Sequence, residues 1–148
     1  MLDLEGVLVY LSRPSPRCGR MPRPYAQQFV DECSILFDEV YMNTCASEEN
    51  ALHALKEEFR ITSFGIHEYQ GGHRYQKARD YEKFENSRII HVEDGISKVE
   101  YARIKELGHH YLPIKSWGLF LSEVEREKDN LLLGILDQIS LIIGKQNA

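Results

Sequence analysis

Short apolar runs alternate with stretches of helical periodicity along these 148 residues, and this alternation limits the fold more than any other feature of the sequence. The apolar runs predict strands at 39–44, 61–66, 88–92 and 111–114. The periodic stretches predict helices at 25–37, 47–59, 97–107 and from 119 to near the C-terminus. Strands joined by helices usually run parallel, so we expect a three-layer α/β fold with a mainly parallel central sheet.

Polar side chains mark two of these strand ends, Asn43 and Thr44 at one and Glu93 and Asp94 at the other. Asp3 and Glu5 mark a third expected strand end, near the N-terminus. In open α/β sheets the carboxyl ends of parallel strands meet at one edge, and ligands bind there. We therefore expect the three groups to converge on a single site.

Asp3 is the residue on which this expected site depends most. Side chains at positions i and i+2 of an extended chain share a face, so Asp3 and Glu5 are expected to lean toward the same pocket. Gly6 then lets the chain turn sharply. A carboxylate at a strand end serves as a nucleophile, as a metal ligand or as a solvated acid. The Glu93–Asp94 pair fits either metal ligands or a helix-capping turn, and the residue types alone leave these alternatives open.

The segment from Tyr10 to Pro24 contains several prolines and has an excess of positive charge. Its prolines and glycine predict no regular secondary structure. Its arginines are Arg13, Arg17, Arg20 and Arg23, with no acid among them. In a chain with a net charge of −5, this excess fits either a solvated loop or an electropositive rim that attracts an anionic substrate.

Composition narrows the class of protein. The net charge of −5 argues against general coating of nucleic acid, although it allows a local basic patch. The three cysteines are an odd number without zinc-site spacing, which indicates reduced thiols in a cytoplasmic protein. We recognise no signal peptide and no membrane-spanning run. A hydrophobic share of 43% over this length suits one domain spanning 1–148.

Local chemistry marks the ends of two predicted helices. Ser97 and Glu100 have the spacing of a capping box at the start of the helix over 97–107, and Gly108 is typical of its end. Pro24 suits the first turn of the helix over 25–37.

The order of these motifs resembles a known family. An acid-x-acid stretch, a strand ending in Thr, a Lys and a strand ending in two acids follow one another as in the haloacid dehalogenase (HAD) superfamily of phosphotransferases. The closest resemblance is to its branch of C-terminal-domain phosphatases, also called NLI-interacting-factor-like. The stretches that carry it are Asp3–Glu5, Arg23–Pro24, Thr44, Tyr75–Lys77, Glu93–Asp94, Pro113–Trp117 and Asp129–Leu132. They extend over nearly the whole chain, and the resemblance implies an HAD fold.

The resemblance also implies catalytic roles. Asp3 is the expected nucleophile, which takes the phosphoryl group as an aspartyl-phosphate. Glu5 stands where the family has its general acid/base aspartate, and its backbone carbonyl is expected to contact the metal. Thr44 is expected to hydrogen-bond the phosphoryl oxygens, with Asn43 as the alternative if the strand register differs by one residue. Lys77 is expected to hold the phosphoryl charge, with Arg79 and Lys83 as nearby alternatives.

A metal ion belongs to the same expected chemistry. Asp94, with Glu93 beside it, is the expected Mg²⁺ site together with Asp3 and Glu5. Oxygen ligands suit this hard cation. Phosphoryl transfer needs its negative charges neutralised, so the carboxylates require a metal ion and a lysine.

The segments between the motifs are too short for a large cap domain, and in this family a missing cap implies an open site. We therefore expect a phosphorylated protein or a phosphorylated nucleic-acid end as the substrate, bordered by Arg13, Arg17 and Arg20. A small phosphate ester fits if oligomerisation closes the site. The alternative function is a catalytically weak HAD-like module that binds a protein or nucleic acid. A dehalogenase fits poorly because it has no use for a metal site at Asp94.

Overall fold

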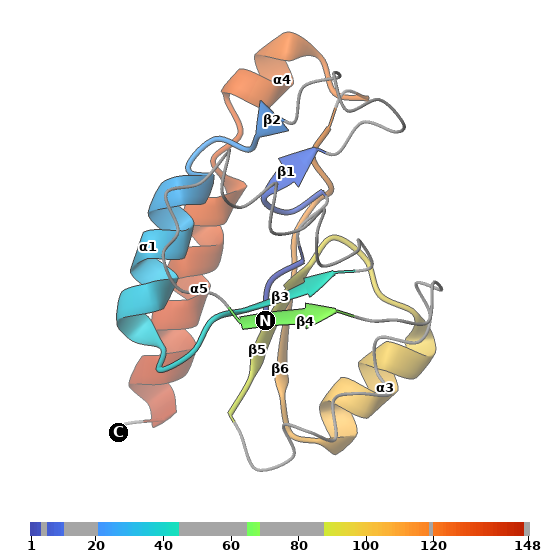
Figure 1. Ribbon diagram of the computed structural model, residues 1–148, viewed down its shortest axis with the longest axis vertical. Coiled ribbons are helices and arrows are strands. Elements are labelled where there is room, and N and C mark those ends of the chain that lie inside the picture. Colours follow the sequence, from blue (N-terminus) through green and yellow to red (C-terminus); the bar gives the residue numbers. More distant parts are fainter. Residues whose placement is uncertain (4–5, 11–20, 45–64, 69–87, 119, 147–148) are drawn as a thin grey trace.

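The computed structural model describes residues 1–3, 6–10, 21–44, 65–68, 88–118 and 120–146 (Figure 1). The strands are β1 (Val9–Tyr10), β2 (Met21–Pro22), β3 (Tyr41–Thr44), β4 (Gly65–Glu68), β5 (Ile90–Glu93) and β6 (His110–Pro113). The helices are α1 (Ala26–Leu36), α3 (Lys98–Glu106), α4 (Glu123–Glu127) and α5 (Leu131–Gln146). The chain is thus an α/β protein, as predicted. No helix in the described part of the chain is long and apolar enough to cross a bilayer.

The first three residues join two pairs of parallel strands. β3 pairs with β4, and β5 pairs with β6, both in parallel. Leu2 bridges Met42 of β3 on one side and Val92 of β5 on the other, again in parallel. The Leu2 nitrogen donates to the Tyr41 carbonyl at 2.8 Å, and the Asp3 nitrogen donates to the Val92 carbonyl at 3.0 Å. The spatial order is therefore β4, β3, residues 1–3, β5, β6, and Asp3 lies at the carboxyl end of the central segment.

The two faces of this sheet differ in their partners. One face is apolar and is covered by α1 and α5, which lie side by side in Figure 1. The residues packed there include Leu2, Met42, Val92, Phe29, Val30, Leu132, Ile135 and Ile139. α3 lies on the other side of β5 and β6, where its Ile104 packs against Met1 and Tyr111. Because alternate residues of a strand face opposite sides, this second face is the one toward which Asp3 points.

Several helix ends follow from local hydrogen bonds. Ser97 and Glu100 form the predicted capping box of α3: the Glu100 nitrogen donates to Ser97 Oγ at 3.2 Å, and the Ser97 nitrogen donates to Glu100 Oε2 at 2.8 Å. Gly108 follows α3 with a φ of +70°, as its C-terminal position requires. Pro24 lies just before α1, whose N-cap is Tyr25.

The prediction of one long helix from residue 119 is wrong. The structure has α4 and α5, separated around Asp129 and Asn130. The Asp129 carboxylate accepts from the Leu131 nitrogen at 3.1 Å, which satisfies a donor at the start of α5. A second helix therefore begins where the apolar pattern suggested continuation.

The prediction of no regular structure from Tyr10 to Pro24 is also wrong in part. β1 and β2 pair antiparallel, with Val9 opposite Pro22 and Tyr10 opposite Met21. Pro22 lacks an amide donor, but a two-residue ladder with a free edge tolerates it. The remaining loop residues, 11–20, lie outside the described residues.

Arg23 is buried, with an exposed fraction of 2%, and connects three parts of the chain. Its guanidinium donates to the carbonyl oxygens of Gly6 at 3.1 Å and Lys115 at 3.0 Å. It also forms a two-pronged ion pair with Asp129, at 3.1 Å and 2.9 Å. The planar fork of five N–H donors lets a single side chain satisfy all these oxygens. The expectation that Arg23 belongs to an exposed basic rim is therefore wrong, and this residue instead supports the turn at Gly6.

Candidate functional site

Three polar side chains lie level with one another at the carboxyl edge of the sheet. Leu2 is in register with Met42 and with Val92, so the next residue of each strand, Asp3, Asn43 and Glu93, forms the following row. These three side chains are on the face opposite the apolar core under α1 and α5. All are buried, with exposed fractions of 9% for Asp3, 0% for Asn43 and 2% for Glu93. Buried polar groups at this density need partners or a function.

A hydrogen bond connects the outer two members of this row. Asn43 Nδ2 donates to Glu93 Oε1 at 2.9 Å. β3 and β5 are separated by the segment that carries Asp3, so their backbones are about 10 Å apart at the usual strand spacing. The two side chains therefore reach toward each other across the strand that ends at Asp3.

Asp94 lies against the turn that follows Asp3. Gly6 has a φ of +80°, and a Cβ at this glycine would come within 2.1 Å of Asp94 Oδ2 and 2.8 Å of Ser116 Oγ. Any larger residue would be strained at this φ and would have to push the Asp94 and Ser116 side chains aside. A backbone hydrogen bond also stabilises this turn: the Trp117 nitrogen donates to the Gly6 carbonyl at 2.9 Å.

The Asp94 carboxylate differs from the Glu93 carboxylate in its burial and in its hydrogen bonding. Asp94 is half-buried, and within the described ranges no hydrogen bond or ion pair engages its carboxylate. Glu93, one residue earlier, is buried and accepts from Asn43. Asp94 is thus the carboxylate of this pair that is open to a ligand.

Negative charge gathers on this side of the sheet. The pKa of Tyr111 is raised from its ordinary value, mainly because the phenol is buried and then because of the charges of Glu93, Asp94 and Glu100. The part of this shift that comes from the three acids reflects a negative potential around the phenol. A cation would neutralise that potential.

The structure brings four of the predicted site residues together. Asp3, Asn43 and Glu93 form one row, and Asp94 follows directly. Thr44 ends β3, where its backbone is in register with Glu68 of β4. The other predicted residues, Glu5, Arg13, Arg17, Arg20 and Lys77, lie outside the described residues, as do Arg79, Lys83 and the helix predicted at 47–59.

Two polar features near the row were not predicted. His91 Nε2 lies 3.1 Å from His109 Nδ1, and both side chains are buried. His91 precedes Glu93 by two residues and therefore shares its face of β5. The only sequence signal for this pair was a histidine inside an apolar strand. No sequence pattern placed Ser116 beside Gly6, although Ser116 belongs to the Pro113–Trp117 stretch.

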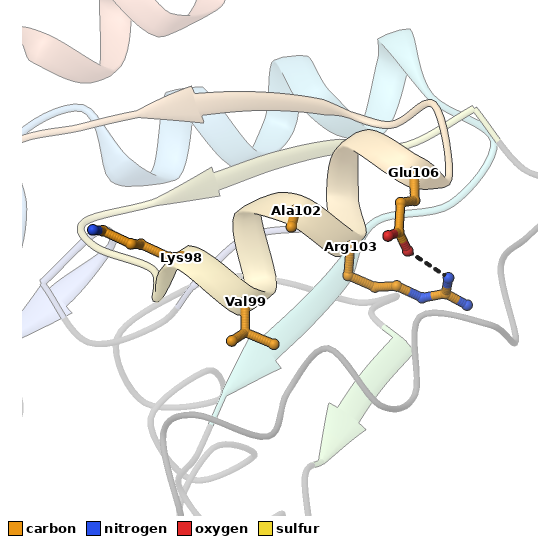
Figure 2. A pocket seen from close by; sticks show the side chains of 5 residues that line it. All are labelled: Lys98, Val99, Ala102, Arg103 and Glu106. Atoms are coloured by element: carbon orange, nitrogen blue, oxygen red, sulfur yellow. Dashed lines mark hydrogen bonds and ion pairs between the residues drawn. The ribbon is translucent and has the colours of Figure 1, made fainter.

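Two hollows on the surface lie away from this row. One, of about 350 Å³, is on the outer side of α3, where the side chains of Lys98, Val99, Arg103 and Glu106 line it (Figure 2). Arg103 and Glu106 pair with each other there at 2.9 Å. The other, of about 550 Å³, is at the amino ends of the strands, around Val40 and Ile89. Parallel sheets bind ligands at their carboxyl edge, so neither hollow is the better candidate.

Comparison with known proteins found no match. A scan against protein-family models gave no match, and searches of the curated proteins and of the solved structures gave none either. Within the described residues, no three His, Cys, Asp or Glu side chains are grouped as a metal site. The candidate site is therefore defined by its geometry: a buried row of Asp3, Asn43 and Glu93, with Asp94 next in the chain and against the turn at Gly6.

Proposed function

We propose that this chain is a Mg²⁺-dependent phosphatase of the HAD type, which hydrolyses phosphoric monoesters through an aspartyl-phosphate on Asp3. The observation that carries the proposal is the alignment of Asp3 with Asn43 and Glu93 at the carboxyl edge, next to the available carboxylate of Asp94. The strand order, with residues 1–3 between two parallel pairs, supports a three-layer Rossmann-like HAD arrangement. The short segments between the motifs are the reason to propose that it has no large cap. The reduced-thiol composition supports a cytoplasmic location.

The proposed reaction has two steps. An oxygen of the Asp3 carboxylate attacks phosphorus, the ester P–O bond breaks, and the leaving oxygen takes a proton from Glu5. A water molecule then gives a proton to Glu5, and its oxygen attacks phosphorus. The bond to Asp3 breaks, which releases phosphate and restores the carboxylate. Thr44 or Asn43 holds the phosphoryl oxygens, and Lys77 offsets their charge.

The donor set of the site fits Mg²⁺. This ion usually binds proteins through one or two carboxylates and fills its remaining positions with water and substrate phosphate. Asp3 and Asp94 supply two carboxylates at the edge of the sheet, and the backbone carbonyl of Glu5 is a third expected ligand. Oxygen ligands of this kind suit Mg²⁺, whereas structural zinc sites are usually built from Cys and His. When bound, Mg²⁺ supplies neutralisation of the phosphoryl charge.

The proposed substrate is a phosphate on an accessible group, either on a protein or on a nucleic-acid end. Arg13, Arg17 and Arg20 are proposed to attract its negative charge at the rim. The second candidate function is a catalytically weak module that uses the same edge to bind a partner. It is favoured by Glu5, which is one methylene longer than the family's aspartate and so displaces the acid by about 1.5 Å.

Hydrolysis of p-nitrophenyl phosphate distinguishes these functions. The wild type is expected to release nitrophenol with Mg²⁺ and to stop when EDTA removes the ion. Asp3→Asn is expected to reduce the rate to background, because the amide is not a nucleophile. Asp137→Asn, an equivalent change on the exposed side of α5, is the matched control and should leave the rate unchanged. Activity that survives in Asp3→Asn refutes the nucleophile, and an inactive wild type that binds Mg²⁺ favours the binding module.

A further inference from the structure

We propose that Asn43 and Glu93 form a buried brace that fixes the position of Asp3, and that both are positioning residues and not ligands of substrate or cation. This inference rests on the proposed function for its catalytic consequence, but not for its structural part. It also revises the roles that the resemblance implies for the two residues, a phosphoryl contact for Asn43 and a Mg²⁺ contact for Glu93.

The first support is the path of the hydrogen bond. Asn43 and Glu93 belong to the two strands that flank Asp3, and their side chains meet at 2.9 Å on the face toward which Asp3 points. A bond between the outer strands limits how far they separate. It therefore limits the space in which the Asp3 carboxylate can move.

The second support is the precision that a nucleophile at the end of this segment requires. Backbone hydrogen bonds tie residues 1–3 to β3 and β5, which places the backbone of Asp3 but does not by itself fix the direction of its side chain. A nucleophile must nevertheless be held to within about 1 Å, because misplacement of that size costs roughly a hundredfold in rate. A side-chain brace across the segment supplies this constraint.

The third support is burial. Asn43 has an exposed fraction of 0% and Glu93 of 2%, whereas Asp94 is half-buried and its carboxylate is not engaged by a hydrogen bond or an ion pair in the described part of the chain. Glu93 accepts from Asn43 inside the protein, and Asp94 is open at the edge. This division assigns cation binding to Asp94 with Asp3, and assigns support of the row to Glu93 with Asn43.

Two substitutions at Glu93 and Asp94 separate a brace from a ligand. Glu93→Gln keeps an oxygen that accepts from Asn43 but removes the charge. The hydrogen bond of the brace is therefore kept, whereas cation affinity would fall if Glu93 were a ligand. Titration calorimetry of the metal-free protein with Mg²⁺ is expected to give a Kd for Glu93→Gln within about twofold of wild type, and a loss of about a hundredfold or more for Asp94→Asn. A Kd for Glu93→Gln that rises as much as that of Asp94→Asn overturns the inference.

A second measurement judges the brace without any reference to activity. The melting temperatures of Asn43→Leu, Glu93→Leu and the double variant are measured on the metal-free protein. Side chains joined by a hydrogen bond are expected to give non-additive shifts, with the double variant less destabilised than the sum of the single ones. Additive shifts overturn the brace. If Asn43→Leu fails to fold, Asn43→Ser, which shortens the side chain away from Glu93, takes its place in the cycle.

Kinetics then test the positioning of Asp3. Loss of the brace in Asn43→Leu is expected to lower kcat for p-nitrophenyl phosphate with little change in KM, whereas loss of a substrate contact raises KM. A rise in KM with unchanged kcat overturns the positioning role. If the wild type neither binds Mg²⁺ nor hydrolyses the ester, the proposed function fails, while the melting-temperature cycle still decides whether the brace exists.

Discussion

Replacing Gly6 by alanine tests the packing of the site in a way that can be worked out from the structure. Two costs add at this position. A residue with a Cβ in the left-handed region loses about 1–2 kcal/mol, and Gly6 has a φ of +80°. The new Cβ would lie 2.1 Å from Asp94 Oδ2 and 2.8 Å from Ser116 Oγ, and overpacking of this kind costs about 1–3 kcal/mol. The free energy of unfolding is therefore expected to fall by about 2–5 kcal/mol in urea denaturation.

Gly108 provides the matched control. It has a φ of +70°, but a Cβ there meets no atom within 4 Å, so Gly108→Ala should cost only the backbone part, about 1–2 kcal/mol. The clash at Gly6 should also diminish in an Asp94→Ala background, where Ser116 Oγ at 2.8 Å is the close atom that remains. Equal losses at the two glycines, or an undiminished loss at Gly6 in the Asp94→Ala background, refute the proposed contact between Asp94 and the turn.

Three further predictions concern the rest of the fold. Arg23→Lys should lower the free energy of unfolding by about 1–3 kcal/mol, because the ammonium keeps the charge but cannot form the two-pronged pair with Asp129 and also satisfy the carbonyls. A urea midpoint close to wild type contradicts this. Burial raises the pKa of Cys33 from 9.0 to about 12, so its thiol should react with Ellman's reagent only after unfolding. Above about pH 9 the unfolded chain loses this thiol proton while the folded chain keeps it, so the free energy of unfolding should fall as the pH rises. Rapid reaction of Cys33 in the folded protein at pH 8 contradicts that burial. Ser97→Ala should cost about 1 kcal/mol by removing the capping box of α3, and an unchanged melting curve argues against the cap.

Much of the architecture could be predicted from the sequence because each signal was local. The strands β3, β5 and β6 and the helices α1 and α3 lie close to the predicted ranges, since apolar periodicity and a capping box act within a few residues. The break at Asp129 was missed because its cause is partly distant. Asp129 is engaged by Arg23, which is more than a hundred residues away in the sequence, and the apolar pattern on either side contains no sign of that ion pair.

The candidate site, too, could be predicted only in part. Convergence of Asp3 with the ends of β3 and β5 could be predicted, because parallel strands bring their carboxyl ends to one edge. The partners of the side chains could not. The register that places Asn43 and Glu93 beside Asp3, and so allows their hydrogen bond, depends on which residue Leu2 bridges. The burial of Arg23 likewise depends on the carbonyl oxygens that surround it, and the charge pattern of its loop suggested exposure.

The most direct test of the account is a crystal structure of the protein grown with Mg²⁺ and beryllium fluoride, which mimics a phosphoryl group. The account predicts the beryllium bonded to an Asp3 carboxylate oxygen, with Mg²⁺ at about 2.0–2.1 Å from oxygens of Asp3 and Asp94 and with Glu93 still bound to Asn43. An Asp94 carboxylate more than about 10 Å from Asp3, or beryllium fluoride bound at another residue, contradicts it.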